Sequence, residues 1–237
     1  MALLLIVFLF FKAVGLIFSL IFGGETLSNG VLSISNRLEQ FDINDEQIKK
    51  GKRFTIIIDP GHGGKDSGAI AAGTEIYEKD IALNVSKKIS SILLRQNDIE
   101  VILTRADDTF LSLVERGEVA NRLGADLFVS IHANSFPDVP SAYGIETYYL
   151  PSDTYDSKTL AEDIQKTIVS YVDTRDRGIK TSVFKVLETA NMPSVLVELG
   201  FLSNIEERMK LVDESYQDEL AKGVAQGILT FIDNNLK

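Results

Sequence analysis

The run Ile56-Ile57-Ile58-Asp59-Pro60-Gly61-His62-Gly63-Gly64 constrains the fold more than any other part of the chain. Its apolar, β-branched start predicts a buried strand, and Asp-Pro-Gly predicts a turn directly after it. The turn delivers His62, one of only two histidines, and the second, His132, follows another apolar run at 127–131. Both imidazoles are therefore predicted at the C-terminal ends of core strands, where functional sites gather.

Apolar runs alternate with helical periodicity from residue 54 onward. The sequence predicts strands at 54–59, 100–104, 126–131, 143–150, 183–187 and 194–199. It predicts helices at 80–96, 111–123, 158–171, 206–212 and 216–234, a loop at 63–74 and a turn at 176–178. This alternation predicts a single α/β domain with a mostly parallel central sheet of about six strands flanked by helices.

The first 52 residues have a different character. Residues 2–22 are apolar apart from Lys12 and Ser19, which is long enough to span a bilayer. An uncleaved signal anchor and a cleaved signal peptide are the alternatives, and the missing basic start and Ala-x-Ala site favour the anchor. We expect a transmembrane or signal helix at 1–23, a linker at 24–52 with a short helix near 46–50, and the globular domain at 53–237. The domain is expected outside the cytoplasm.

Composition narrows the chemistry. The formal net charge of −10 argues against a nucleic-acid partner, which requires a basic face. The absence of cysteine excludes disulfides and thiolate ligands, so any metal must be held by histidine and carboxylate groups.

Four residues form a candidate metal and acid/base set: His62, Glu78, His132 and Glu198. Two histidines and one carboxylate suit catalytic zinc, which takes three protein ligands and leaves a position for water. A second carboxylate can take the water's proton and return it to a leaving amine. The spacing alone leaves a structural interpretation open. A strand-end histidine is often structural, Glu78 would suit a helix N-terminus, and Glu198 would suit a salt bridge.

Seven segments resemble the zinc-dependent N-acetylmuramoyl-L-alanine amidases of bacterial cell walls. They are, in chain order, IIIDPGHGGKDSGA, YEKDIAL, VILTR, ADLFVSIHAN, GIETYYL, DRGIK and MPSVLVELGFLSN. The resemblance implies zinc bound by His62, Glu78 and His132, with Glu198 as the catalytic carboxylate. It also implies cleavage of the amide between N-acetylmuramic acid and the L-alanine of the stem peptide. Peptidoglycan would then be the substrate.

Further residues receive weaker assignments. Glu75 competes with Glu78, which carries the EKD match, and Asn134 is either a substrate contact or a turn residue. Arg177 is a candidate substrate contact. Structural roles are expected for Asp59, Glu146, Arg105 and Arg116, with the two arginines in ion pairs.

The expected layout of the chain is an anchor, a short linker and a catalytic domain with no visible blocking insertion between His132 and Glu198. This layout resembles that of the sporulation and germination amidases of endospore formers. That resemblance implies action on spore cortex, in the making of muramic δ-lactam, in the space between the forespore and mother-cell membranes. An activating partner protein is also expected, because the loop at 63–74 forms a plausible mobile wall of the site. A vegetative wall-remodelling amidase, a non-catalytic peptidoglycan-binding regulator and a zinc peptidase that cuts within the stem are the alternatives.

Overall fold

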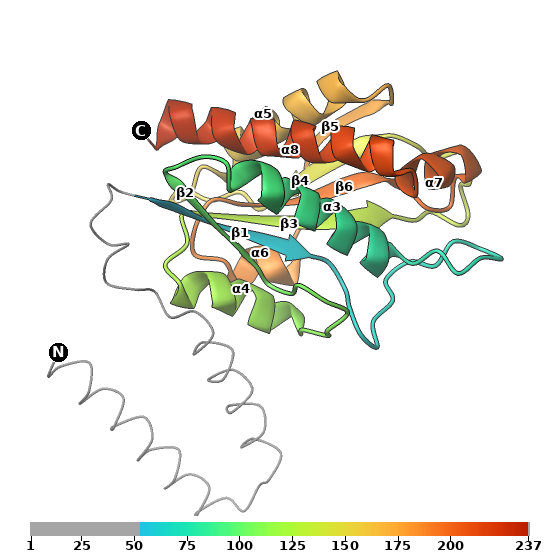
Figure 1. The fold of residues 1–237 in the computed structure, drawn as a ribbon, viewed down its shortest axis with the longest axis horizontal. Helices are drawn as coiled ribbons and strands as arrows, with labels where there is room; N and C mark the ends of the chain where they lie inside the picture. The colour runs from blue at the N-terminus through green and yellow to red at the C-terminus, as the bar shows by residue number, and fades with distance from the viewer. Residues whose placement is uncertain (1–52, 237) are drawn as a thin grey trace, which may run out of the picture. The chain divides into compact units, whose positions relative to one another are not determined.

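Six strands form one sheet in the order β2-β1-β3-β6-β4-β5 (Figure 1). This computed structural model describes residues 53–236. The strands are β1 (Phe54–Pro60), β2 (Ile99–Leu103), β3 (Leu127–Asn134), β4 (Ile145–Tyr149), β5 (Asp176–Thr181) and β6 (Ser194–Phe201). Neighbours are parallel except for β4, which pairs antiparallel with β6. The predicted mostly parallel α/β sheet is confirmed.

The direction of β4 places its first residues at the edge of the sheet where β1, β3 and β6 end, called the functional edge below. The C-terminal ends of the parallel strands β1, β3 and β6 lie at one edge, where sites form in such sheets. Because β4 runs the other way, its first residues meet the end of β6, and Glu146 lies opposite Glu198. Glu198 is in turn the register partner of His132. Three potentially reactive side chains therefore stand on three adjacent strands.

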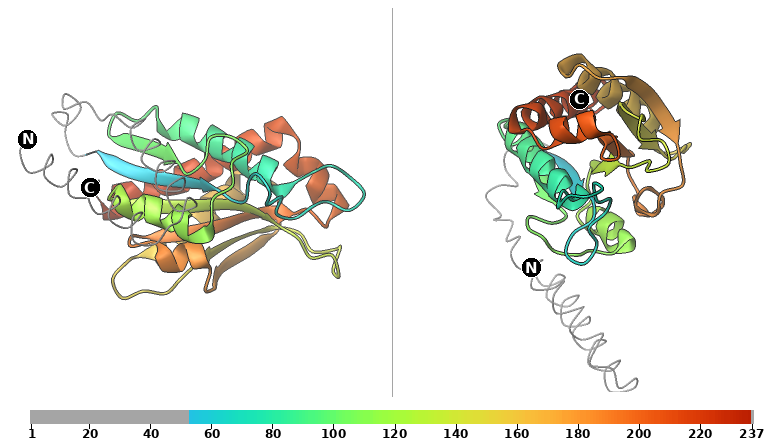
Figure 2. Two further views of the ribbon diagram at one scale, coloured as in Figure 1. Left: turned by 90° about the horizontal axis from the view of Figure 1, so that it is seen from below. Right: turned by 90° about the vertical axis from the view of Figure 1, so that its right-hand side faces the viewer.

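Helices cover both faces of the sheet (Figures 1 and 2). They are α3 (Glu78–Leu93), α4 (Leu113–Arg122), α5 (Ser157–Tyr171), α6 (Lys185–Thr189), α7 (Ile205–Leu211) and α8 (Glu214–Asn235). Helices α3, α5 and α8 pack on one face, and α4 and α6 pack on the other. The N-terminus of α4 is fixed by a capping box between Ser112 and Glu115.

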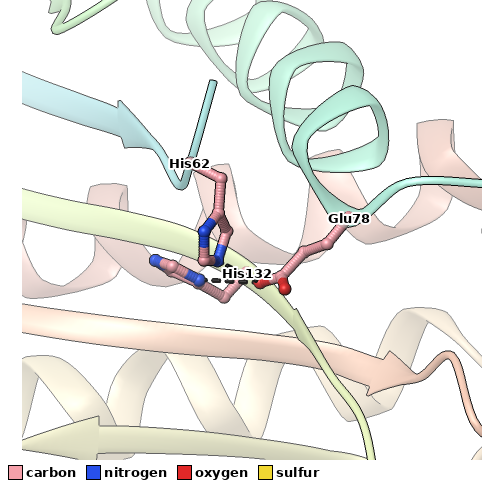
Figure 3. A group of neighbouring side chains, drawn as sticks. All are labelled: His62, Glu78 and His132. Carbon is pink, nitrogen blue, oxygen red and sulfur yellow. Dashed lines mark hydrogen bonds and ion pairs between the residues drawn. The ribbon is translucent and has the colours of Figure 1, made fainter. Parts of the chain in front are cut away.

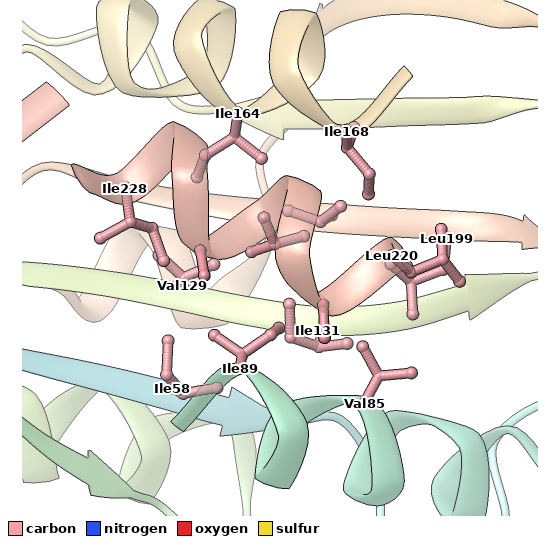
Figure 4. Packing of buried hydrophobic residues seen from close by; sticks show 14 of the residues in the cluster. Ile58, Val85, Ile89, Val129, Ile131, Ile164, Ile168, Leu199, Leu220 and Ile228 are labelled. Atoms are coloured by element: carbon pink, nitrogen blue, oxygen red, sulfur yellow. The ribbon is translucent and has the colours of Figure 1, made fainter. Parts of the chain in front are cut away.

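The larger core lies under α3, α5 and α8 (Figure 4). Alternate residues of each strand point to it, because side chains in a strand alternate between faces. Ile58 and Val129 of the sheet are fully buried against helix residues such as Ile89, Ile164 and Ile228. Burial of each such side chain contributes about 1.5–3 kcal/mol. This core supports the sheet whose strand ends carry the site.

Two predictions about local structure are wrong. Residues 183–187 are not a strand: the chain forms the short helix α6, whose Val186 and Leu187 pack into the core on the α4 side. Residues 176–178 are not an isolated turn but begin β5, an edge strand with no fully buried residue. A short apolar run fits either a strand or a helix, and a polar edge strand has no apolar run at all.

The predicted anchor at 2–22, the linker up to residue 52 and the short helix near 46–50 lie outside the described residues. Within 53–236, no helix combines the length and apolarity needed to cross a membrane.

Candidate metal centre and acid/base site

Three side chains from separate elements converge at the functional edge (Figure 3). His62 follows the end of β1, Glu78 is the first residue of α3, and His132 lies near the end of β3. Their ligand atoms all lie within 4.8 Å of one another. No other group of three or more such residues is found in the described part of the chain.

The distances fit a shared metal ion. Glu78 Oε1 lies 3.0 Å from His62 Nε2 and 2.8 Å from His132 Nδ1. Two ligand atoms that each lie about 2.0–2.1 Å from a tetrahedral metal are about 3.3 Å apart. Two nitrogens and one oxygen suit zinc and related divalent metals. The donor set therefore fits a transition metal with three protein ligands.

Hydrogen bonds hold the ligands in place from behind. Asp66 Oδ2 lies 2.9 Å from His62 Nδ1, and the other ring nitrogen, Nε2, faces Glu78. Glu78 accepts from the backbone N–H groups of Ala69 at 2.8 Å and Ala133 at 3.1 Å. Burial raises the pKa of Glu78, but hydrogen bonds from His132 and His62 outweigh it and hold that pKa well below its ordinary value. Glu78 is therefore a carboxylate, the form that binds metal.

Two glycines allow the ligands to approach. A Cβ on Gly61 would lie 2.4 Å from the His132 ring, and one on Gly68 would lie 2.6 Å from Glu78 Oε2. His62 itself has a φ of 59°, and among residues 53–236 it is the only non-glycine residue with positive φ. That left-handed conformation costs roughly 1–2 kcal/mol, so surrounding contacts must impose it.

Two buried arginines impose that conformation. Arg116 pairs with Asp59 at 2.8 Å and donates to the carbonyl oxygens of Pro60 and His62 at 2.7 and 2.6 Å. Arg105 donates to the carbonyl oxygens of Pro60 and Gly61, at 3.0 and 2.7 Å. It also donates to the carbonyl of Lys79 at 2.7 Å, and so ties the turn to the start of α3. The ion pair expected for Arg116 is confirmed, whereas Arg105 binds backbone carbonyls.

Glu198 stands beside this cluster without a comparable set of partners. It is 9% exposed, and its Oε2 is buried with no hydrogen-bond partner among the described residues. Burial raises the pKa of Glu198 well above its ordinary value, and the negative charges of Glu78 and Glu146 add to the effect. A raised pKa suits a group that must both accept a proton and return it.

A cavity of about 360 Å³ opens onto all four residues. Besides the ligands and Glu198, its lining includes Asn134, Leu113 and Phe184. Asn134 also serves the fold, since its Nδ2 donates to Glu146 at 3.0 Å and its Oδ1 accepts from the N–H of Ser135 at 2.7 Å. The cavity offers room for a substrate group next to both the ligands and the acid/base candidate.

The structure brings together the four residues that the sequence singled out. Glu78, and not the exposed Glu75, joins the cluster. Asp59 is fully buried and pairs with Arg116, as a structural role requires. Asp66 was not anticipated. Its only signal is a spacing of four residues from His62, inside a loop where aspartate is a common turn residue.

Comparison with known proteins agrees with this geometry. Residues 56–230 match the family described as N-acetylmuramoyl-L-alanine amidase. A crystal structure of such an amidase from Clostridium difficile 630 is 46% identical, with a TM-score of 0.76, and the match covers 78% of this chain and 99% of that one. The CwlD amidase from Clostridioides difficile, solved in complex with the GerS lipoprotein, is 36% identical with a TM-score of 0.72, covering 76% and 99%.

One curated relative adds a biological context. The sporulation-specific N-acetylmuramoyl-L-alanine amidase of Bacillus subtilis is 37% identical over 174 residues, which cover 73% of this chain and 66% of that protein. With the matched region spanning nearly all of the described fold and the whole site, the chain belongs to the N-acetylmuramoyl-L-alanine amidase family.

Proposed function

We propose that this chain is a zinc-dependent hydrolase that cuts the amide bond between N-acetylmuramic acid and L-alanine in peptidoglycan. The observation that supports it most is the His62–Glu78–His132 cluster beside a buried carboxyl, Glu198, that has an unpartnered oxygen. Family membership supports the substrate class.

The ligand atoms in this proposal are His62 Nε2, Glu78 Oε1 and His132 Nδ1. Bound zinc lowers the pKa of a water molecule and polarises a carbonyl. His62 and His132 act as neutral ligands, and Asp66 fixes the ring orientation of His62 through Nδ1. Arg105 and Arg116 keep the His62 turn in position through its carbonyl oxygens.

Glu198 moves the proton. As the attacking water forms its bond to the lactyl carbonyl carbon, Glu198 accepts the water's proton. It then donates that proton to the nitrogen of L-alanine as the C–N bond breaks, so that the amine leaves neutral. A carboxyl with a raised pKa suits both halves of this transfer, because it holds the proton between them.

One experiment tests metal and reaction together. The full chain and His132→Ala are assayed for zinc content and for release of stem peptide from purified peptidoglycan. We expect near one zinc per wild-type chain, with zinc and peptide release both lost in the variant. Mass spectrometry of the products should show intact stem peptides with a free L-alanine amine. Cleavage inside the stem would favour a zinc peptidase instead.

We further propose that the amidase acts during sporulation. Similarity to the sporulation-specific amidase of Bacillus subtilis and to the CwlD amidase supports action on spore cortex peptidoglycan, in muramic δ-lactam formation. In this proposal residues 1–23 anchor the chain, 24–52 link it, and 53–237 act in the space between the forespore and mother-cell membranes. We expect the chain to release stem peptide faster from isolated cortex than from vegetative peptidoglycan. The reverse preference would favour a vegetative wall-remodelling role.

An activating partner is part of the proposal. The CwlD amidase was solved in complex with the GerS lipoprotein, and the loop at 63–74 carries the Asp66 and Ala69 contacts to the ligands. A partner that orders this loop would raise metal affinity. The first experiment supplies zinc freely. In zinc-limited buffer, by contrast, the isolated chain is expected to bind little metal, and a lipoprotein from the same cell should restore its occupancy. Full occupancy and full activity of the isolated chain in that buffer would contradict it.

A further inference from the structure

A cationic pair lies next to the site, on the side away from the metal ligands. Four side chains donate to the fully buried carboxylate of Glu146: Asn134 at 3.0 Å, Tyr148 at 2.8 Å, Arg177 at 2.5 Å and Lys180. The two charged donors come from the edge strand β5. They reach Glu146 from the edge strand beside β4, and Asn134, which also donates to Glu146, lines the cavity.

This pair has more positive charge than Glu146 can neutralise. Among the described residues, Arg177 and Lys180 form ion pairs with Glu146 alone. Two cations therefore share one carboxylate, and hydrogen bonds from both help to keep its pKa below the ordinary value. The Lys180 side chain remains 36% exposed and the Arg177 side chain 18%. One positive charge is left over and accessible to solvent, in a chain whose net charge is −10.

The other cations around the cavity are already balanced or inaccessible. Lys79 pairs with Asp108 at 2.7 Å, and Lys185, at the cavity lining, pairs with Glu188 at 3.4 Å. Arg116 is buried against Asp59. Arg105 is buried, and its guanidinium donates hydrogen bonds to backbone carbonyl oxygens. The unbalanced charge near the site therefore lies on the β5 side.

Contacts connect the cationic pair to the cavity. Asn134 lines the cavity and donates to Glu146. Phe184 also lines it and packs edge-to-face on Tyr148, with ring centroids 5.2 Å apart. The Tyr148 hydroxyl donates to Glu146, and Lys180 Nζ lies 5.8 Å from the centre of the Tyr148 ring. A substrate that fills the cavity and extends past Asn134 toward β5 approaches the cationic pair.

The spacing suits a peptide that leaves the metal toward β5. His132, Glu198 and Glu146 are successive register partners on adjacent strands, so their backbones span about 10 Å at about 4.8 Å per strand. An extended peptide advances about 3.3–3.6 Å per residue. In the stem peptide the free or amidated carboxyl of the second residue sits on its α-carbon, so one step along the chain moves that group toward the pair when the first residue's amide lies at the ligands.

We propose that Arg177 and Lys180, anchored by Glu146, form a subsite that binds a carboxylate of the stem peptide, on the residue after the L-alanine. This inference rests on the proposed amidase function, since it assumes that the scissile amide lies at the metal ligands. The subsite orients the peptide arm and favours substrates in which that carboxylate is free over those in which it is amidated.

The test combines the variant Lys180→Met with amidation of the substrate carboxylate. Two muropeptides that differ only in a free or amidated carboxylate at the second stem residue are assayed with wild type, Lys180→Met and Lys222→Met. The last variant removes an exposed lysine of α8 that pairs with Glu219. Wild type and Lys222→Met are expected to prefer the free acid roughly tenfold in kcat/KM, mainly through KM. Lys180→Met should lose most of that preference, which Lys222→Met should retain.

A binding measurement separates this inference from the proposed function. Calorimetry compares the affinity of the two muropeptides for Glu198→Gln and for Glu198→Gln/Lys180→Met, so that no turnover is needed. Tighter binding of the free acid, lost with Lys180, supports the subsite even if the wild type cleaves neither substrate. Equal affinity for the two forms, an equal preference in Lys180→Met, or no binding at millimolar concentration would overturn it.

Discussion

Glu146 and Glu198 face each other across adjacent strands, yet their surroundings differ completely. Glu146 is surrounded by four donors, two of them cationic, and its pKa is lowered. Glu198 has a buried oxygen without a partner among the described residues, and its pKa is raised. A carboxylate with several donors is stable and fixed, whereas one with few donors can exchange a proton. The sheet thus carries one carboxylate that its donors hold in place and one, Glu198, whose surroundings suit the proposed proton transfer.

Ionised Glu146 also affects the pKa of Glu198. The negative charge of Glu146 contributes to the raised pKa of Glu198. Asn134, Arg177 and Lys180 all donate to Glu146, and none of them donates to Glu198. Donors to the charged form of Glu198 would lower its pKa.

The largest expected effect comes from Glu198→Gln. Removing the proton carrier should slow stem-peptide release by about 10²- to 10⁴-fold, with zinc content unchanged because the three ligands remain. Zinc analysis and a muropeptide digest on the same sample provide the measurement. Loss of zinc would make Glu198 a ligand. Unchanged activity with tight peptidoglycan binding would favour a non-catalytic binding protein.

Glu146→Gln should act mainly on stability. It removes the countercharge of Arg177 and Lys180 inside the fold, and we expect the free energy of unfolding to fall by about 2–3 kcal/mol. Urea unfolding measures this. The control is Glu162→Gln, which breaks an exposed pair with Lys158 at 3.5 Å and should cost under about 1 kcal/mol. Equal effects of the two variants would show that the buried cluster adds nothing.

The difference in unfolding free energy between wild type and Glu146→Gln should depend on pH, with a defined sign. A carboxyl whose pKa is lower in the folded than in the unfolded chain stabilises the fold above its ordinary value, here 4.5, and loses that contribution as pH falls. The stability gap between wild type and Glu146→Gln should thus be full at pH 7 and shrink below about pH 4.5. Urea curves at several pH values measure the gap. A gap that stays constant to pH 3 would contradict the lowered pKa.

The smallest effect is expected from Tyr148→Phe. It removes one neutral donor to Glu146 and leaves the other three, so the loss in unfolding free energy should be about 1 kcal/mol. Chemical denaturation at pH 7 is sensitive enough to detect it. A loss as large as that of Glu146→Gln would mean that the hydroxyl, and not the cations, holds the carboxylate.

The sequence predicted the parts of the site that follow strong apolar strands. His62, His132 and Glu198 adjoin buried runs of Ile, Val and Leu, where periodicity is most informative. Glu78 was identified through its resemblance to a family motif. The cluster around Glu146 was not predicted, because it depends on β5, whose polar sequence Asp-Arg-Gly-Ile-Lys-Thr looks like a turn. Its pairing with β4 is a tertiary contact that no local pattern encodes.

The strand order has a consequence for how the molecule is built. β6 is the last strand to be synthesised, yet it lies between β3 and β4 in the sheet. His62, Glu78 and His132 all precede it in the chain, after β1, at the start of α3 and in β3. Glu198 and its opposition to Glu146 exist only after β6 has inserted. Synthesis therefore delivers the three candidate ligands first and the candidate proton carrier last, and the acid/base site is complete only when β6 lies between β3 and β4.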